Sequence, residues 1–270
     1  VERVKDADIV IFASGISPSL EGEEMGVNLP GFKKGDRTDI ELPAVQRELI
    51  DALHRAGKKI ILVNCSGSPI GLEPEIQKCE AILQAWYPGQ QGGKAVAEVL
   101  FGDYNPAGKL PVTFYRNVSQ LPDFEDYNMT GRTYRYMQDV PLFPFGYGLS
   151  YTTFGYGKAV LDKNELTAGQ SLKLTVPVTN TGKRNGEEVV QVYLRKQGDA
   201  EGPIKTLRAF KRVSIPAGKT VNVEFDLKDK ELEWWDDQSN TVRVCPGNYD
   251  IMVGGSSKEE DLQRTTIAIK

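Results

Sequence analysis

The sequence predicts an α/β domain with a mostly parallel sheet, followed by an all-β sandwich domain. In the first half of the 270 residues, continuous apolar runs alternate with helix-like periodicity, and after Tyr151 the period changes to two. A chain of this length suits two domains of roughly 100–200 residues each. The predicted boundaries are 1–120 for the α/β domain, 121–155 for a connecting segment and 156–270 for the sandwich.

The strands of the first domain are predicted from short apolar runs that end in turn residues. Asp8–Ala13 closes at Ser14-Gly15, which is typical of a strand buried on both faces. Lys59–Val63 and Ala81–Trp86 are the next two predicted strands. Strands of this kind, separated by helices, favour a parallel sheet.

Two helices are predicted in the same domain. The first covers Pro43–Ala56, with Pro43 where a helix begins and Gly57 where it ends. Its expected inward face consists of Val45, Leu49, Ile50 and Leu53. The second covers Gln91–Phe101, and its expected inward residues are Ala95, Val96, Val99 and Leu100.

The second half has the pattern of half-buried strands. Apolar residues alternate with polar ones from Leu172 to Val178. Similar runs, parted by Gly- and Pro-rich turns, are Val189–Leu194, Val221–Leu227, Tyr249–Val253 and Thr266–Ile269. Short strands without helices favour a β-sandwich of the immunoglobulin or fibronectin type. The aromatic segment from Leu121 to Phe154 is too apolar for a free linker, and we expect it to pack against both domains.

Composition and charge argue against several classes of function. Lys and Arg number 33 against 37 Asp and Glu, a net charge of −4 with no basic block, so neither a nucleic-acid nor an anionic-membrane partner is expected. No apolar run approaches the roughly 20 residues that span a bilayer. The only histidine, His54, lies inside a predicted helix, which argues against a Ser-His-Asp triad and against a zinc site.

Cofactor and disulfide signals are equally weak. Gly67-Ser68-Pro69-Ile70-Gly71 lacks the residues of a phosphate-binding or dinucleotide-binding loop, so no cofactor and no metal are expected. For Cys65, Cys79 and Cys245, buried thiols are favoured over a disulfide, because Cys65 follows a buried strand.

The candidate site is the long connection between the first strand and the first helix. It follows the carboxyl end of a strand, where open α/β sheets place their ligand sites, and it is far longer than the usual 2–6 residues. It contains Glu21, Glu23 and Glu24. Because neighbouring carboxylates resist joint ionisation, one of them can act as a general acid. A solvated acidic surface loop is the alternative, and composition alone favours it.

Seven segments in order carry a specific resemblance. They are Leu20–Glu23, Gly35–Arg37, Leu42–Ile50, Val63–Pro69, Ala85–Gln90, Leu100–Phe114 and Phe143–Phe154. Together they resemble the second domain of glycoside hydrolase family 3, and the residues after 155 are similar to the fibronectin type III-like domain of that family. The resemblance covers essentially the whole chain.

The resemblance implies a retaining β-glycosidase, which uses an aspartate nucleophile and a glutamate acid/base. Glu23 matches the acid/base best because Gly22 precedes it; Glu21 is the second choice and Glu24 the third. In many members Glu-Gly-x-Asp-Arg is contiguous, whereas here 11 residues separate Glu24 from Asp36, which leaves the register of the glutamate open.

The nucleophile of the family belongs to a (β/α)8 barrel, and no Asp in this sequence matches its motif. We therefore expect a barrel in the same chain upstream of Val1 or as a partner, and we expect the chain alone not to hydrolyse glycosides. The implied substrate is a terminal, non-reducing β-linked sugar of an oligosaccharide or aryl β-glycoside. The glutamate loop is most similar to that of bacterial β-xylosidases, with β-glucosidases as relatives, and the resemblance implies a periplasmic or extracellular location.

A noncatalytic carbohydrate-binding or interaction protein built on the same two domains is the competing hypothesis. Exposed aromatic side chains would serve it by stacking on sugars. For Trp86-Tyr87 core packing is favoured. Of Trp234-Trp235 at most one is expected to be exposed, because adjacent strand residues point to opposite faces. Asp36-Arg37 could order the glutamate loop through an ion pair, with solvated side chains as the alternative.

Overall fold

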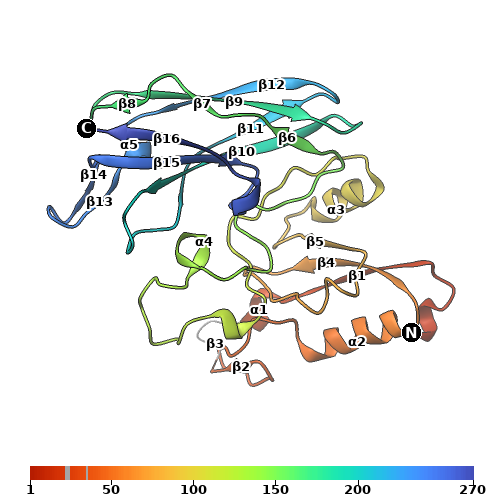
Figure 1. Ribbon diagram of the computed structural model, residues 1–270. Helices are drawn as coiled ribbons and strands as arrows, with labels where there is room; N and C mark the ends of the chain where they lie inside the picture. Colours follow the sequence, from red (N-terminus) through yellow and green to blue (C-terminus); the bar gives the residue numbers. More distant parts are fainter. Residues whose placement is uncertain (22–24, 35) are drawn as a thin grey trace. The chain divides into compact units, whose positions relative to one another are not determined.

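The computed structural model of the protein describes residues 1–21, 25–34 and 36–270 (Figure 1). The chain divides into two compact units. Unit 1 consists of residues 1–104, 114–126 and 141–143, and unit 2 of residues 105–113, 127–140 and 144–270. The aromatic segment 121–155 thus contributes residues to each unit.

Unit 1 is built on a three-stranded parallel sheet in the order β1-β4-β5. The strands are β1 (Ile9–Gly15), β4 (Lys59–Cys65) and β5 (Ala81–Gln84). Ile9 aligns with Lys59, and Ile61 aligns with Ala81. The parallel sheet and its helices confirm the predicted α/β fold. Smaller elements of the unit are η1 (Glu2–Val4), α1 (Pro18–Glu21), β2 (Phe32–Lys33), β3 (Asp36–Arg37) and η2 (Val118–Gln120).

Helix α2 (Ala44–Arg55) covers one face of this sheet (Figure 1). Ile50 and Leu53 are buried in the core of the unit, but Val45 is 71% and Leu49 41% exposed, so half of the predicted inward face was wrong. At 100° per residue, the buried face is centred near position 46 rather than on Leu49. Gln46 occupies that position, and its side chain bonds to the end of β1.

Two other predictions of buried residues, for α3 and for β1, were wrong in part. Helix α3 (Gly92–Phe101) leaves Val96, Val99 and Leu100 half-buried and Ala95 exposed. Strand β1 was predicted to be buried on both faces, yet Ile9 and Ile11 are 52% and 51% exposed. Among the described residues β1 pairs only with β4, so it is an edge strand with one half-exposed face.

Unit 2 is a β-sandwich, which confirms the second predicted fold. One sheet has the order β11-β10-β15-β16-β8, and the other has β12-β9-β6 with β7 paired to β9. The strands are β6 (Phe154–Tyr156), β7 (Val160–Leu161), β8 (Glu165–Leu166), β9 (Leu172–Asn180), β10 (Gly186–Lys196), β11 (Thr206–Ile215), β12 (Thr220–Leu227), β15 (Gly247–Gly254) and β16 (Gln263–Ile269). Alternate residues of both sheets, such as Val176, Val190 and Ile251, form the core.

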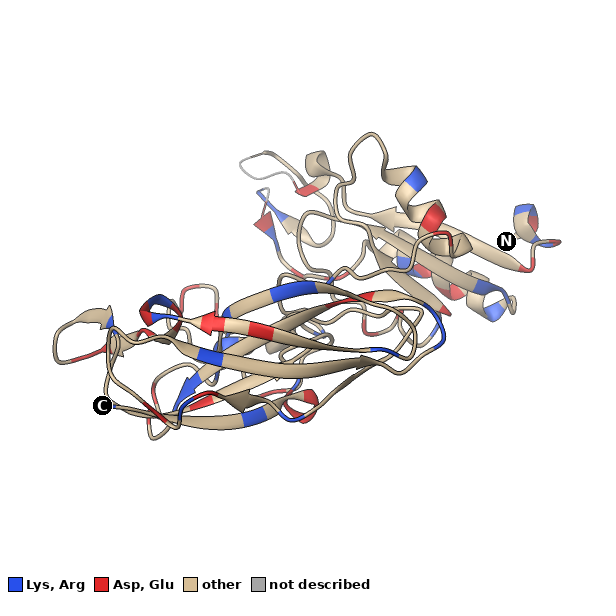
Figure 2. Ribbon diagram, turned by 90° about the horizontal axis from the view of Figure 1, so that it is seen from above, with Lys and Arg blue, Asp and Glu red and all other residues tan. Residues whose placement is uncertain are grey.

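The remaining elements of unit 2 are short. They are α4 (Thr133–Tyr136), α5 (Asp229–Leu232), β13 (Trp234–Asp236), β14 (Thr241–Arg243) and η3 (Glu259–Asp261). Acidic and basic residues are interspersed along the strands of the sandwich (Figure 2). In the described part of the chain, no helix combines the length and apolarity that crossing a membrane requires.

Candidate active-site loop

The three parallel strands of unit 1 bring their carboxyl ends to one edge of the sheet. There β1 ends at Gly15, which has a φ of +127°. A Cβ on Gly15 would overlap the carbonyl oxygen of Cys65 at the end of β4. The next residue, Ile16, donates its N–H to that same oxygen at 2.9 Å. Only glycine therefore allows the chain to leave the sheet along this path.

Helix α2 is tied to the same point by one side chain. The Gln46 amide accepts a hydrogen bond from the Gly15 N–H at 3.1 Å and donates one to the Gly15 carbonyl at 2.8 Å. Both backbone groups of Gly15 are thus satisfied at the place where the candidate loop starts. Gln46 belongs to one of the segments that carried the family resemblance.

The loop begins with the single turn α1. Ser17 caps this turn: its carbonyl accepts the Glu21 N–H at 2.9 Å, and its hydroxyl accepts the Leu20 N–H at 3.2 Å. Leu20 packs against the buried core of the unit. The backbone of Glu21 is therefore fixed by a cap on one side and by an apolar contact on the other.

The side chain of Glu21 meets the loops that follow the other two strands. Ser68, after β4, donates its hydroxyl to Glu21 Oε1 at 2.9 Å. Tyr87, after β5, donates its hydroxyl to the carbonyl of Ile16 at 2.8 Å. Burial and a hydrogen bond with Glu21 raise the pKa of the Tyr87 hydroxyl above its ordinary value. Side chains after all three strands thus converge at Glu21.

A buried polar network supports these loops. Asn64 donates to Gln84 Oε1 at 2.6 Å, and Gln84 donates to the Ser66 hydroxyl at 3.1 Å. The Ser66 hydroxyl in turn donates to the carbonyl of Ser68 at 2.8 Å. Asn64 and Ser66 are fully buried. No role was predicted for these residues from the sequence, although Asn64 and Ser66 lie in the segment Val63–Pro69; the available signal was a polar side chain at the end of each apolar strand.

Arg37, on the β2–β3 hairpin, is a cation that interacts with Asp39 and Glu21. It donates to the carbonyl of Glu41 at 2.7 Å and lies 3.8 Å from Asp39. Burial lowers the pKa of its guanidinium, and the negative charges of Asp39 and Glu21 oppose this shift. In the described contacts its ion-pair partner is Asp39 rather than Asp36, so the Asp36–Arg37 ion pair considered from the sequence is not formed there.

The predicted acid/base residues divide into two groups. Glu21 is described and lies in the cluster with Ser68 and Tyr87. Glu23, the first choice, and Glu24 lie outside the described residues, as does Gly22. Which glutamate is the acid/base stays a prediction.

The structure also gives the exposure and contacts of the other residues that were considered in the sequence. His54 is exposed in the last turn of α2, and the three cysteines are free thiols. Trp86 is half-buried and packs edge-on against Phe114, but Tyr87 is 41% exposed, so core packing was wrong for Tyr87. Trp234 is 2% and Trp235 49% exposed, as the strand alternation predicted. In the part of the chain that the structure describes, no three His, Cys, Asp or Glu side chains gather as metal ligands.

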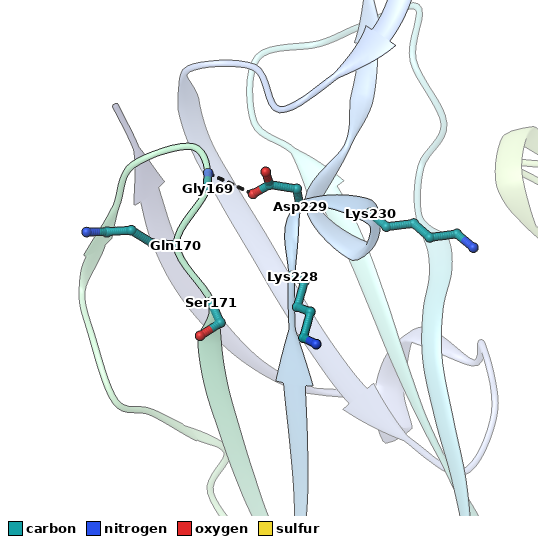
Figure 3. A pocket seen from close by; sticks show the side chains of 6 residues that line it. All are labelled: Gly169, Gln170, Ser171, Lys228, Asp229 and Lys230. Atoms are coloured by element: carbon teal, nitrogen blue, oxygen red, sulfur yellow. Dashed lines mark hydrogen bonds between the residues drawn. The ribbon is translucent and has the colours of Figure 1, made fainter.

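Unit 2 has a small depression of about 390 Å³ beside the turn that precedes β9. Its lining residues are Gly169, Gln170, Ser171, Lys228, Asp229 and Lys230 (Figure 3). Asp229 accepts the N–H of Gly169 at 2.9 Å, which closes the turn onto α5. Lys228 and Lys230 point in different directions in Figure 3, so their charges do not converge on a ligand.

Comparison with known proteins places this arrangement in a family. Residues 1–151 match the glycosyl hydrolase family 3 C-terminal domain, and residues 188–257 match the fibronectin type III-like domain. The chain belongs to glycosyl hydrolase family 3. The family that the sequence resembled is thereby confirmed, together with the order of its α/β and all-β parts.

Relatives of this family 3 chain are named as glycosidases. Over 269 residues it is 57% identical to a xylan 1,4-beta-xylosidase of Xylanibacter ruminicola, a match that covers 100% of this chain and 31% of the relative. A periplasmic beta-glucosidase of Salmonella typhimurium is 37% identical, with 95% of this chain and 34% of that protein covered. The solved structure of a β-glucosidase from Erythrobacter marinus matches with a TM-score of 0.84 at 39% identity, covering 100% of this chain and 35% of that one. The chain spans about a third of the length of these relatives.

Proposed function

We propose that this chain is the C-terminal part of a retaining β-xylosidase or β-glucosidase and that it supplies the acid/base glutamate. The observation that carries the proposal is the acidic loop at the carboxyl edge of the parallel sheet, whose first glutamate, Glu21, is held by Ser68. The glycosidase names of the relatives support the same reaction class.

In this reaction the glutamate first protonates the oxygen of the leaving group while an aspartate attacks the anomeric carbon. The resulting carboxylate then activates the water that hydrolyses the glycosyl-enzyme. Glu23 is the proposed acid/base, with Glu21 as second choice and Glu24 as third. The aspartate is proposed to come from a (β/α)8 barrel, in the same chain or as a partner, which has to bring its carboxyl to about 5–5.5 Å from the glutamate.

Without that barrel the glutamate has neither a nucleophile nor a sugar pocket, so the positioning that gives most of the rate is absent. We expect the 270-residue chain alone to release no aryl alcohol from an aryl β-xyloside above the buffer rate. Turnover by the purified chain that disappears in Glu23→Gln would overturn this part of the proposal. Reading the coding sequence upstream of Val1 provides the complementary test, since an in-frame barrel is expected there or in a partner.

The proposed substrates are oligosaccharides and aryl glycosides with a terminal, non-reducing β-linked sugar. The 57% identity to a named xylosidase favours xylose over glucose. The complete protein should therefore give a higher kcat/KM with an aryl β-xyloside than with the matched aryl β-glucoside, and the reverse order would move the assignment to a β-glucosidase. The periplasmic relative supports a location outside the cytoplasm.

A further inference from the structure

We infer that Ser68 is a positioning residue of the acid/base loop and that Glu21 is the anchor of that loop rather than its proton donor. The inference deepens the proposed function and rests on it for the catalytic role of the loop. Its geometric basis is the contact between two loops that follow different strands, since Ser68 and Glu21 are 47 positions apart in the sequence.

Ser68 is a rigid donor. Its hydroxyl lies 2.9 Å from Glu21 Oε1, and its carbonyl is held by the Ser66 hydroxyl at 2.8 Å. Ser66 is fully buried and is hydrogen-bonded by Asn64 at 3.2 Å and by Gln84 at 3.1 Å. The network therefore fixes the Ser68 hydroxyl, and through it the Glu21 carboxylate, relative to β4 and β5.

The second oxygen of Glu21 lies against Gly67. A Cβ on Gly67 would be 3.0 Å from Glu21 Oε2 and 2.6 Å from Cε2 of Tyr87. Glycine is thus the residue that leaves room for both side chains in the same place. With Ser68 on one oxygen and Gly67 against the other, the carboxylate is held by the loop after β4.

These contacts suit an anchor. A general acid needs a carboxyl group that can reach the leaving oxygen of the substrate. Glu21 instead accepts the Ser68 hydroxyl with one oxygen and lies against Gly67 with the other. The cap from Ser17 and the buried contact of Leu20 fix its backbone as well. We therefore assign the proton-donor role to one of the two later glutamates of the loop, with Glu23 as first choice and Glu24 as the alternative.

The first test measures kcat/KM of the complete protein on aryl β-xylosides with good and poor leaving groups. If Ser68 positions the acid, Ser68→Ala should lose about tenfold on the poor leaving group and little on the good one, because only the former needs protonation. Ser68→Thr keeps a hydroxyl and should restore most of the rate. The matched control is Ser239→Ala, which removes a hydroxyl that also donates to a carboxylate, that of Asp236, and should change neither value. Equal losses of kcat/KM on both substrates would show that Ser68 has only a structural role and would contradict the inference.

The second test separates the anchor from the acid. Glu21→Gln retains an oxygen that accepts from Ser68 and should stay within about threefold of the native kcat/KM, a loss smaller than the removal of a general acid gives. If the kcat/KM of Glu21→Gln instead falls at least 100-fold on the poor leaving group and azide raises its kcat on the good one, Glu21 is the acid and the inference is wrong. In that rescue azide attacks the anomeric carbon of the glycosyl-enzyme, the bond to the aspartate breaks, and a β-glycosyl azide forms without a general base, because azide, unlike water, has no proton to lose.

A third measurement does not depend on activity. Hydrogen exchange of the amides in Ile16–Glu21 should be faster in Ser68→Ala than in the native complete protein and unchanged in Ser239→Ala. No acceleration would show that the contact does not hold the loop. If exchange accelerates but neither Glu21→Gln nor Glu23→Gln affects the poor leaving group, the proposed function fails while the Ser68–Glu21 contact stands.

Discussion

Gly15 shows how one residue determines where the candidate loop starts. Its φ of +127° lies in a region that residues with a Cβ rarely adopt, and the carbonyl of Cys65 occupies the space of that Cβ. The hydrogen bonds to Gln46 depend on this conformation. A single glycine therefore couples the end of β1, the end of β4 and the first turn of α2.

Gly15→Ala should lower the free energy of unfolding of the chain by at least about 2 kcal/mol, because the backbone has to move away from Cys65. Urea unfolding followed by circular dichroism measures the change. The matched control is Gly93→Ala in α3, where nothing lies within 4 Å of the added Cβ; there the free energy should rise by about 0–1 kcal/mol. Equal effects at the two sites would contradict the geometry.

Asp236, on β13, gives the stability a defined pH dependence. Hydrogen bonds from Ser239 and Arg243 lower its pKa from 3.8 to about 2. Since the folded pKa is below the unfolded one, the contribution is fully present above about pH 4 and is lost as the pH falls through about 2.

Asp236→Asn should therefore lower the urea midpoint at pH 7, and the difference from the native chain should shrink as the pH approaches 2. The measurement is the urea midpoint of both proteins from pH 7 to pH 2. A difference that stays constant over this range would show that the Asp236 carboxylate is not the titrating group.

At the scale of elements, the sequence predicts the strands and helices whose apolar side chains recur at a regular spacing. The apolar runs of β1, β4 and β5 and the Pro43 start of α2 were identified in this way. Strand β11 was missed, because as an edge strand it exposes residues such as Phe210 and carries charged ones. The acidic loop was found from its length and charge. The contact between Ser68 and Glu21 was not, because hydrogen bonds between distant loops leave no local pattern.

One buried side chain joins the end of β9 to three neighbouring segments. Asn180 donates to the carbonyls of Arg184 and Ile215 at 2.8 and 2.9 Å, and it accepts from the Thr152 hydroxyl at 2.6 Å and from the Gly182 N–H at 3.1 Å. Thr152 belongs to Phe143–Phe154, one of the segments that carried the resemblance to the family. Asn180 thus fixes that segment to the sandwich.

Asn180→Ala should cost about 2–4 kcal/mol of unfolding free energy, since it leaves buried backbone groups without partners. Thermal and urea unfolding measure this loss. The exposed Asn222 on β12 provides the control, and Asn222→Ala should change the free energy by no more than about 0.5 kcal/mol. A small loss at Asn180 would mean that water replaces its hydrogen bonds.

At the scale of the whole molecule, the chain is about a third of the length of its relatives, and its site is correspondingly partial. Unit 1 provides the carboxyl edge of the parallel sheet, the glycine at which the chain leaves β1 (Gly15), and Glu21, which accepts a hydrogen bond from Ser68. The proposed nucleophile and the sugar pocket are assigned to the barrel. Fold and family were readable from the sequence, whereas the proposed activity depends on how the acid/base glutamate approaches the proposed aspartate.

The most direct measurement is the leaving-group dependence of kcat/KM for the complete protein with Glu23→Gln. If the loop supplies the general acid, the loss should grow as the leaving group becomes poorer and reach at least about 100-fold on the poorest aryl β-xyloside. The best leaving group, which needs no proton, should retain nearly the native kcat/KM. A native rate on every substrate, or the same loss on all of them, would contradict the assignment of the acid/base to this loop position.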